Sequence, residues 1–253
     1  MVMLYFSGTG NSKYIAGLFC RQFNSKAYSI EENIDFEELI KQEETIGFCY
    51  PVYASRVPRI MREFAVKYTD HLKNKKLIIF CTQVLFSGDG ARSFTDIFPR
   101  GHVKVIYAEH FLMPNNVCNF FLTPLESEKK VEKYIANAER KMRLVCADIK
   151  AGTIKKRGFN IISRILGLIQ GVFVPAMEKM ARKSVRINDN CTQCGLCIEL
   201  CPMSNLAGEN GKITHKNNCT ACYRCINKCP EKAINVFIRG KIKKQYNFIG
   251  EIQ

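Results

Sequence analysis

Eight of the 13 cysteines lie between residues 191 and 229, and their spacing limits what this end of the chain can fold into. The segment 190–202, NCTQCGLCIELCP, recurs at 218–230 as NCTACYRCINKCP, so a shift of 28 residues superimposes the two copies. Each copy has the spacing C-x2-C-x2-C-x3-C-P. Little apolar sequence lies between these cysteines, so this part cannot build a hydrophobic core of its own. Bound metal must therefore hold it together.

The distribution of the cysteines also indicates the compartment and the kind of metal. A long chain with an odd number of cysteines and no signal peptide ahead of its first apolar run is typical of a reducing cytosol, not of a secreted disulfide scaffold. Structural zinc is the alternative, but zinc sites usually take two C-x2-C pairs a dozen or more residues apart. Four cysteines within eleven positions, repeated and followed by proline, favour iron–sulfur clusters. The scattered cysteines are expected to be buried as small apolar side chains: Cys20, Cys49, Cys81, Cys118 and Cys146.

The repeat resembles the module of bacterial ferredoxins that holds two 4Fe-4S clusters, over about residues 188–240, with every ligand position present. In that family the fourth cysteine of each repeat binds the cluster of the other repeat. The resemblance implies that one cluster is bound by Cys191, Cys194, Cys197 and Cys229. It implies that the second cluster is bound by Cys219, Cys222, Cys225 and Cys201.

The first 150 residues alternate short apolar runs with amphipathic segments. Buried strands are expected over 1–7, 45–52, 76–84 and 102–113, with a weaker strand near 27–30. Helices are expected over 11–23, 58–68, 92–98 and 126–150. Strands that alternate regularly with helices predict an α/β fold with a doubly wound parallel sheet.

A small-residue loop lies where the first strand passes into the first helix. Its members are Ser7, Gly8, Thr9, Gly10, Asn11 and Ser12. Such a turn offers backbone N–H groups, hydroxyls and the positive end of a helix dipole to a phosphate. No Walker motif is present, and Lys13 stands where a dinucleotide fingerprint needs a third glycine. A tight strand-to-helix connection without a ligand is the other interpretation of this loop.

In this context the loop resembles the phosphate loop of flavodoxins, and the expected sheet is similar to theirs, with FMN at the switch point. The resemblance implies that the phosphate is held by Ser7, Thr9, Asn11 and Ser12. In that family two further loops hold the flavin ring, and the corresponding stretches here are Pro51, Val52, Tyr53 and Ala54 after the third strand and residues 82–90, beginning at Thr82, after the fourth.

The ring contacts implied by the same resemblance come from both stretches. Tyr53 would lie near or against the ring, and Gly88, Asp89 and Gly90 would offer backbone to its polar edge. The stretch 82–90 lacks the aromatic–glycine arrangement typical of flavodoxins. The turn at residues 113–116, Met-Pro-Asn-Asn, is expected to shape the mouth of the flavin side.

Residues 151–190 join the two parts and carry eight basic and two acidic side chains. A helix is expected, with one wide apolar stripe and with Ser163, Gly167 and Gly171 on another face, where small residues allow close backbone approach. Polar residues and Pro175 interrupt the stretch, so we do not expect it to span a membrane. Three roles stay open: a helix packed between two domains, a segment lying on an anionic membrane, and a partner-docking face.

The order of the parts resembles flavodoxin–ferredoxin fusion proteins of anaerobic bacteria and archaea. It implies a flavodoxin-like FMN domain over 1–150, a helical connection over 151–187 and a small α+β ferredoxin-like domain over 188–253. The implied function is that of a cytoplasmic electron-transfer protein, which passes electrons between two 4Fe-4S clusters and FMN and on to redox partners. The alternative is a flavin-dependent reductase of a small substrate, fed by its own clusters.

The formal net charge of +15 bears on the partners. So basic a chain ordinarily suggests nucleic acid or an anionic membrane. Two anionic clusters and the FMN phosphate would lower the charge to about +9, so we expect acidic redox partner proteins, with no nucleic acid and with 155–183 as a candidate for peripheral membrane contact. A nucleic-acid-binding protein with structural clusters is a third class, suggested by charge alone. No catalytic triad or carboxylate pair is evident, and no catalytic residue is assigned.

Overall fold

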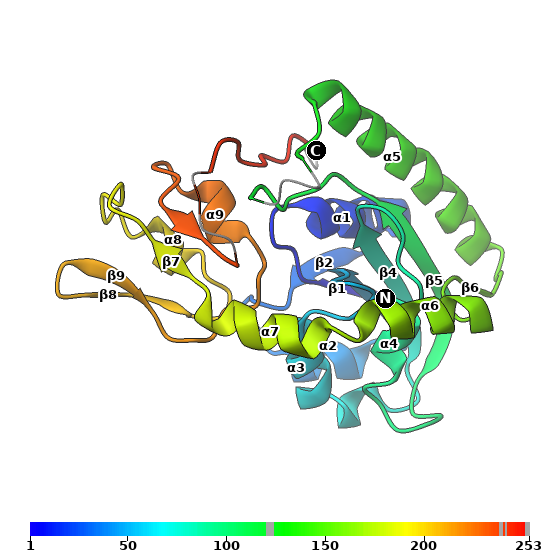
Figure 1. Cartoon of the computed structure of the whole chain (residues 1–253). Helices are drawn as coiled ribbons and strands as arrows, with labels where there is room; N and C mark the ends of the chain where they lie inside the picture. The colour runs from blue at the N-terminus through cyan, green and yellow to red at the C-terminus, as the bar shows by residue number, and fades with distance from the viewer. Residues whose placement is uncertain (120–123, 238–239, 241, 251–253) are drawn as a thin grey trace.

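The computed structural model describes residues 1–119, 124–237, 240 and 242–250. A twisted sheet with helices on both faces forms the larger part, and a smaller part made of loops and short hairpins lies beside it (Figure 1). Two helices, α6 (Ile161–Gly171) and α7 (Val174–Lys183), run along one side of the sheet toward the smaller part.

The sheet is parallel throughout, with the strand order β2-β1-β3-β4-β5-β6. The strands are β1 (Val2–Tyr5), β2 (Lys26–Ser29), β3 (Thr45–Pro51), β4 (Lys76–Gln83), β5 (Lys104–Leu112) and β6 (Lys155–Lys156). The direction in which strands are added reverses between β1 and β3, which makes this place the switch point of the sheet. The predicted doubly wound α/β fold is confirmed.

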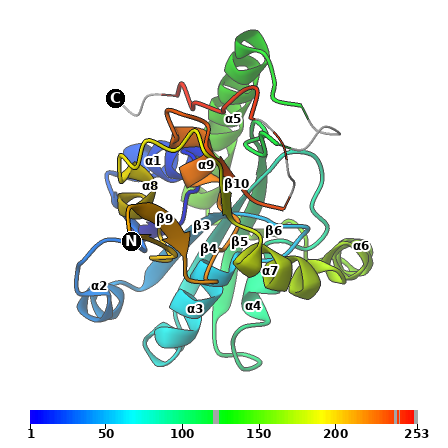
Figure 2. The same ribbon diagram turned by 60° about the vertical axis from the view of Figure 1, so that its left-hand side comes forward.

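Helices cover both faces of the sheet (Figure 2). One face packs against α1 (Asn11–Phe23) and α5 (Glu128–Lys150). The other packs against α2 (Phe36–Gln42), α3 (Arg59–Lys67), the 3-10 turn η1 (Asp70–Leu72) and α4 (Arg92–Thr95). Because both faces are covered, β3 and β4 are buried along most of their length, and their sequences are continuous apolar runs instead of alternating ones. The short helix α2 was not among the predicted elements.

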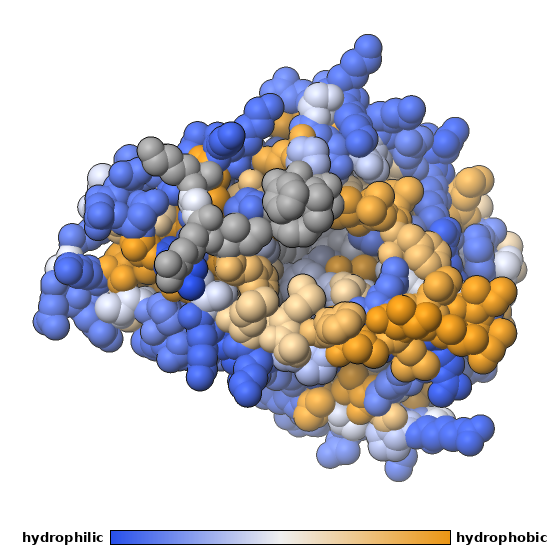
Figure 3. Space-filling view, in the orientation of Figure 1, coloured by the Kyte–Doolittle hydropathy of each residue, from blue (hydrophilic) through white to orange (hydrophobic). Residues whose placement is uncertain are grey.

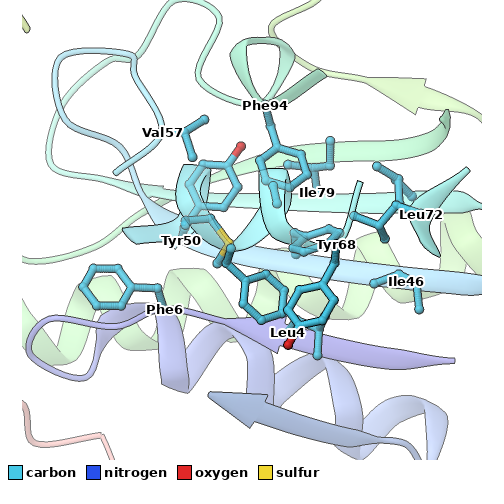
Figure 4. Packing of buried hydrophobic residues seen from close by; sticks show 14 of the residues in the cluster. Leu4, Phe6, Ile46, Tyr50, Val57, Tyr68, Leu72, Ile79 and Phe94 are labelled. Atoms are coloured by element: carbon cyan, nitrogen blue, oxygen red, sulfur yellow. The ribbon is translucent and has the colours of Figure 1, made fainter. Parts of the chain in front are cut away.

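The core between the sheet and α3–α4 combines aliphatic side chains with phenylalanine and tyrosine, which supply all of its aromatic rings because the chain has no tryptophan. Figure 4 shows Tyr50 and Phe94 packed together in it, and their ring centroids are 5.5 Å apart. The fully buried Tyr50 hydroxyl donates a hydrogen bond of 3.1 Å to the carbonyl oxygen of Gly90. Aromatic pairs such as Tyr50 and Phe94 stabilise a core by about 0.5–1.5 kcal/mol in addition to the free energy gained from the apolar area they bury. This hydrogen bond also fixes the loop after β4 against the core.

The sixth strand, β6, lies in a basic run for which no strand was predicted, and it pairs with Tyr107 and Ala108 of β5. Next to them the buried carboxylate of Glu109 forms ion pairs with Lys141 at 2.9 Å and with Arg157 at 3.2 Å. Burial alone would raise the pKa of Glu109, but these cations outweigh burial and hold the pKa below its usual range. The charge of Glu109 therefore fastens β6 to the sheet, which a periodicity argument cannot detect.

The smaller part is a small α+β unit. Its strands are β7 (Arg186–Ile187) paired with β10 (Ile234–Asn235), and β8 (Leu206–Glu209) paired with β9 (Lys212–His215), all antiparallel. Its helices are α8 (Leu196–Glu199) and α9 (Arg224–Lys228). The stretch 151–187, predicted to be purely helical, thus begins with a strand of the large sheet and ends with a strand of the small unit.

Candidate functional site

A cavity of about 560 Å³ lies at the carboxyl ends of β1, β3 and β4, beside the switch point of the sheet. From the large part it is lined by residues 7–9, 11–12, 51–54, 82–84, 113–114 and 116–117. Its remaining lining residues are Val174, Met177, Glu178, Met180 and Ala181 of α7, with Thr220, Ala221, Tyr223 and Phe237 of the small unit. The cavity therefore lies between the sheet, the connecting helix and the cysteine-rich unit.

The predicted phosphate loop forms one end of this cavity. α1 begins at Asn11 with no side-chain cap, and among the described residues no acceptor is found for the backbone N–H groups of its first turn. Gly10 has a φ of 112°, a conformation that favours glycine and brings the loop into the helix. The Ser7 hydroxyl accepts a hydrogen bond of 3.1 Å from the Gly10 N–H, and the hydroxyls of Ser12 and Thr82 are 2.8 Å apart. An uncapped helix N-terminus at one end of a cavity fits a phosphate.

Other side chains of the loop brace it against its neighbours. The Asn11 amide donates 2.9 Å to the carbonyl of Pro114 and accepts 2.6 Å from the Tyr246 hydroxyl. The Thr9 hydroxyl accepts 3.0 Å from the Asn116 amide. The turn after β5, expected to shape the mouth of the site, therefore holds the loop directly. The chain near its C-terminus also reaches the loop.

The first predicted ring loop also lies at the cavity, which is lined by Pro51, Val52, Tyr53 and, from the next strand, Thr82. Tyr53 and Arg56 exchange backbone hydrogen bonds of 2.9 and 3.0 Å across a tight turn. Ala54 and Ser55 in that turn have positive φ values of 46° and 62°. This strained turn projects from the end of β3 and places Tyr53 in the cavity wall.

The other predicted ring contacts, Gly88, Asp89 and Gly90, do not line the cavity. Asp89 is fully buried and pairs with Arg56 at 3.1 Å. A Cβ at Gly88 would overlap the backbone nitrogen of Gly167, because α6 lies directly on this loop. Gly88 is thus packed against α6, and the structure does not place the backbone of Gly88, Asp89 and Gly90 at the cavity.

The eight clustered cysteines surround two small hollows in the small unit. The first hollow is lined by Cys191, Cys194, Cys197 and Cys229, and the second by Cys201, Cys219, Cys222 and Cys225. Each hollow thus takes three cysteines from one repeat and one from the other, in the groups that the resemblance implied. No three His, Cys, Asp or Glu residues in the described chain lie close enough to hold a single metal ion. Four thiols spread around a hollow fit a larger inorganic core.

The internal repeat extends to the backbone conformation. Gln193 and Ala221, which are 28 positions apart, have φ values of 59° and 54°, and Gly195 and Tyr223 have 79° and 62°. Successive residues that alternate in this way curl the chain so that backbone N–H groups converge on one point, a geometry that stabilises anions. Both repeats therefore wrap their hollows in the same way.

Backbone N–H groups donate to cysteine sulfurs in both hollows. The distance is 3.3 Å from Asn205 N to Cys201 Sγ, and likewise from Ala233 N to Cys229 Sγ. Burial raises the pKa of the Cys222 thiol to about 12. A thiolate at this depth is stable only beside a strong positive charge, which coordinated iron supplies. Donors to sulfur then tune the potential of such a site.

Two residues, Thr220 and Tyr223, line both the cavity and the second hollow. No described residue lines both the cavity and the first hollow. Cys194 in the first hollow is exposed, whereas Cys222 in the second is buried. The second hollow therefore adjoins the cavity, whereas the first hollow shares no lining residue with it.

One arginine fastens the small unit to the phosphate loop. The Arg224 guanidinium donates 2.7 Å to the carbonyl of Ser7 and 3.2 Å to that of Gly8, and it forms a bidentate pair with Glu31 at 2.7 Å. Gly8 itself touches the backbone of Cys222, whose carbonyl oxygen a Cβ at position 8 would overlap. The loop predicted to hold phosphate and the loop that carries a cysteine of the second hollow are thus in direct contact.

We expect Gly8→Ala to weaken flavin binding about tenfold, because overpacking at a rigid contact costs about 1–3 kcal/mol. The added methyl group would push the phosphate loop from the Cys222 loop, so the iron content should fall as well. Flavin fluorescence and iron analysis measure both effects. Gly208→Ala is the matched control, because the nearest atom to its Cβ would be 3.8 Å away. Wild-type values of both quantities in Gly8→Ala would contradict the close contact.

The wall contributed by α7 was not predicted from the sequence. Its position is set by Glu178, which forms two hydrogen bonds of 2.8 Å with the Arg62 guanidinium of α3. Tyr223 and Arg224 were also missed, because their roles depend on the large part. The apolar spacing of Val174, Met177 and Ala181 was the only available signal, and it indicates a buried face without saying what that face covers.

Comparisons with known proteins give one family match for the larger part of the chain and another for the cysteine-rich part. Residues 2–167 match the family model of the flavodoxin domain, and residues 190–234 match that of the 4Fe-4S dicluster domain. A search among curated proteins gave no match.

Several solved structures are similar to a little over half of the chain. The two-electron reduced flavodoxin of Megasphaera elsdenii is 17% identical with a TM-score of 0.39, and the match covers 56% of this chain and 99% of that one. A flavodoxin from the domain Archaea is 14% identical with a TM-score of 0.38, covering 59% and 97%. The Trp repressor binding protein of Bacillus subtilis is 12% identical with a TM-score of 0.40, covering 55% and 96%.

Proposed function

The chain belongs to the flavodoxin domain family through residues 2–167 and carries a 4Fe-4S dicluster domain at residues 190–234, and we propose that it passes electrons between two 4Fe-4S clusters and a bound FMN and on to redox partner proteins. The two domains give it an electron-transfer or redox role. FMN supplies one- and two-electron chemistry, and an iron–sulfur cluster supplies one-electron chemistry. The observation that carries the proposal is the wall of Thr220 and Tyr223, which the cavity and the second hollow share.

We assign FMN to the cavity. Its phosphate would be held at the N-terminus of α1 by the backbone of residues 7–12, with the hydroxyls of Ser7, Thr9 and Ser12 within reach. Its ring would lie between Tyr53, residues 82–84 and the α7 wall. Burial raises the pKa of Tyr53 well above its usual value, so this side chain stays neutral and offers an apolar face with one hydroxyl.

We assign one cluster to each hollow, with the four cysteines of that hollow as ligands. The residues of the chain contribute in three ways. The thiolates hold the metal, the converging N–H groups offset the negative charge, and Tyr223 excludes water from the wall between the second hollow and the cavity. Because small changes in these surroundings shift a one-electron potential, the chain's own residues set the direction of flow.

The first hollow is the end at which we place the docking of a redox partner. Cys194 is exposed there, and the first hollow shares no lining residue with the cavity. Exposed lysines of the same unit, among them Lys212, Lys228 and Lys232, carry no ion pair among the described residues. A surface of this charge favours encounter with an acidic protein and makes the association rate fall as salt rises.

A reductase of a small substrate is the second candidate, and one observation favours it. Met177 and Met180 of α7 line the cavity and are also about half exposed, so an apolar approach to the cavity exists beside α7. Anaerobic single-turnover experiments on photoreduced protein separate the two candidates. Fast oxidation by carrier proteins but not by small molecules supports the carrier, and the reverse supports the reductase.

The proposal as a whole is tested by the composition of anaerobically purified protein. We expect about eight iron and eight sulfide per chain, from two 4Fe-4S clusters, with about one FMN and a brown visible spectrum. Colourless protein that carries zinc would overturn the cluster assignment. A full iron content without flavin would overturn the assignment of the cavity and leave the cluster assignment standing.

A further inference from the structure

The outer face of α6 is a continuous apolar surface that no described part of the chain covers. We call it the α6 ridge, and its members are Ile161, Ile162, Ile165, Ile169, Val172 and Phe173. All but Ile165, which is 51% exposed, have between 63 and 69% of their surface exposed. Figure 3 shows the ridge as the large apolar patch at one end of the molecule. A contiguous apolar patch that is exposed to water marks a site of interaction.

The opposite face of α6 fixes the ridge in its outward orientation. Gly167 lies so close to Asp89, and Gly171 so close to Arg56, that a Cβ at either glycine would overlap these side chains. The Gln170 amide donates to the carbonyl of Phe86 at 3.3 Å and accepts from the backbone N–H of Gly88 at 3.1 Å. A rotation that buried the ridge would break each of these contacts. The apolar face is therefore exposed by the way in which the helix is attached.

The charges around the ridge identify what covers it. The connecting stretch 151–190 holds eight basic and two acidic side chains, and one of the acidic ones, Glu178, is paired with Arg62. Exposed cations lie before, within and after the ridge segment in the chain, at Lys156, Arg164 and Arg182, and the described chain offers them no ion pair. Two copies joined through their ridges would bring these cations together. Anionic lipid headgroups complement them, while the lipid chains take up the aliphatic side chains.

The same geometry indicates that the helix lies on a bilayer and does not cross it. Among the described residues, the stretch Ile161–Lys183 is long and apolar enough to cross a membrane. However, α6 itself has 11 residues and measures about 16 Å, roughly half of the hydrocarbon thickness. Its continuation, α7, holds the ion pair between Glu178 and Arg62 and lines the cavity. We propose that the α6 ridge seats the protein on the surface of an anionic lipid bilayer.

Vesicle sedimentation with the anaerobically purified full chain tests this. The chain should bind vesicles of phosphatidylcholine containing about one third phosphatidylglycerol at least tenfold more strongly than vesicles of phosphatidylcholine alone, and added salt should weaken the binding. The double substitution Ile169→Glu and Phe173→Glu should lower binding at least tenfold. Leu144→Glu on α5 is the matched control, since this side chain is 65% exposed and lies outside the ridge. Flavin and iron contents verify that the variants are folded.

Three results would overturn the proposal. The first is equal vesicle binding by the wild type and the ridge variant, or no binding by either. The second is a wild-type dimer that the ridge substitutions make monomeric, without vesicle binding, which would assign the ridge to a second copy. The third is wild-type protein that stays with bilayers through washes with high salt and alkali, which would indicate a spanning helix.

Discussion

Anaerobically purified Cys222→Ser protein should hold about half of the wild-type iron and should no longer exchange electrons between its remaining cluster and its flavin. Cys222 is a buried member of the second hollow, and its carbonyl oxygen lies against Gly8 of the phosphate loop. The second hollow alone shares wall residues with the cavity. Loss of the cluster in the second hollow would leave the remaining cluster in the first hollow, which shares no wall with the cavity. Iron and sulfide analysis and flash photolysis of the flavin measure the two effects.

Cys194→Ser is the matched variant, because Cys194 lines the first hollow, which shares no wall with the cavity. It should lose a similar amount of iron but keep the fast exchange between the flavin and the remaining cluster. The two variants thus separate the order of the sites from the mere presence of a cluster. Full iron content in Cys222→Ser would contradict the ligand assignment. Equal exchange in both variants would contradict the serial arrangement.

The parts of the fold that were predicted correctly are those whose causes are local in the sequence. β3 and β4 are continuous apolar runs because helices cover both of their faces. The cysteine groups follow from one spacing that occurs twice, and the structure gathers them around two hollows. The loop between β1 and α1 follows from its small residues, and the structure places it at one end of the cavity. In each case a short stretch of chain determines the geometry.

The parts that were not predicted depend on contacts between distant residues. β6 is held by Glu109, whose pairing with Lys141 and Arg157 joins three separate segments. The backbone of Gly88 was expected at the edge of the flavin ring, yet Gly88 lies against Gly167 of α6. The sequence pattern around a small residue does not show whether the residue makes room for a ligand or for another part of the chain.

One departure within the repeat is explained by the structure. Tyr223 occupies the position that Gly195 has in the first copy, and it adopts a φ of 62°, which costs a residue with a side chain about 1–2 kcal/mol. Its buried ring forms the wall between the second hollow and the cavity, where a glycine would leave a gap. Gly195 lines only the first hollow, which shares no lining residue with the cavity. At this position of the repeat, the strain occurs only in the copy that adjoins the cavity.

The contact between the two parts has a similar origin. The large part supplies bare backbone at Ser7 and Gly8, and the small unit supplies the long side chain of Arg224. The Arg59 guanidinium of α3 donates 2.6 Å to the carbonyl of Asn218, which precedes Cys219 of the second hollow. Each part thus sends one arginine to the backbone of the other. Charged donors on carbonyl oxygens are stronger than neutral ones, so a small interface holds a fixed distance.

Arg224→Ala should raise the dissociation constant of FMN roughly thirtyfold, which corresponds to about 2 kcal/mol. The guanidinium holds the carbonyls of Ser7 and Gly8, and these residues shape the loop to which we assign the phosphate. Without it, the loop loses two charge-assisted hydrogen bonds, and Glu31 keeps a partly buried charge with no partner. Flavin fluorescence measures the binding. The rate of electron exchange between flavin and clusters should fall as well, because the two parts are then no longer held at one distance.

A double-mutant cycle with Glu31→Gln separates the ion pair from the contact to the loop. Since Glu31 touches Arg224 but lies outside the cavity lining, Glu31→Gln should raise the dissociation constant only a few-fold, by about 0.5–1 kcal/mol. In the double variant the effect should be somewhat smaller than that of Arg224→Ala alone, because the substitution of Glu31 removes the charge that Arg224→Ala leaves without a partner. Arg224→Lys should be intermediate, since the three N–H donors of an ammonium group cannot replace the five hydrogen bonds that the Arg224 guanidinium makes. If Glu31→Gln weakened FMN binding as much as Arg224→Ala did, the ion pair and not the hold on the carbonyls would position the loop.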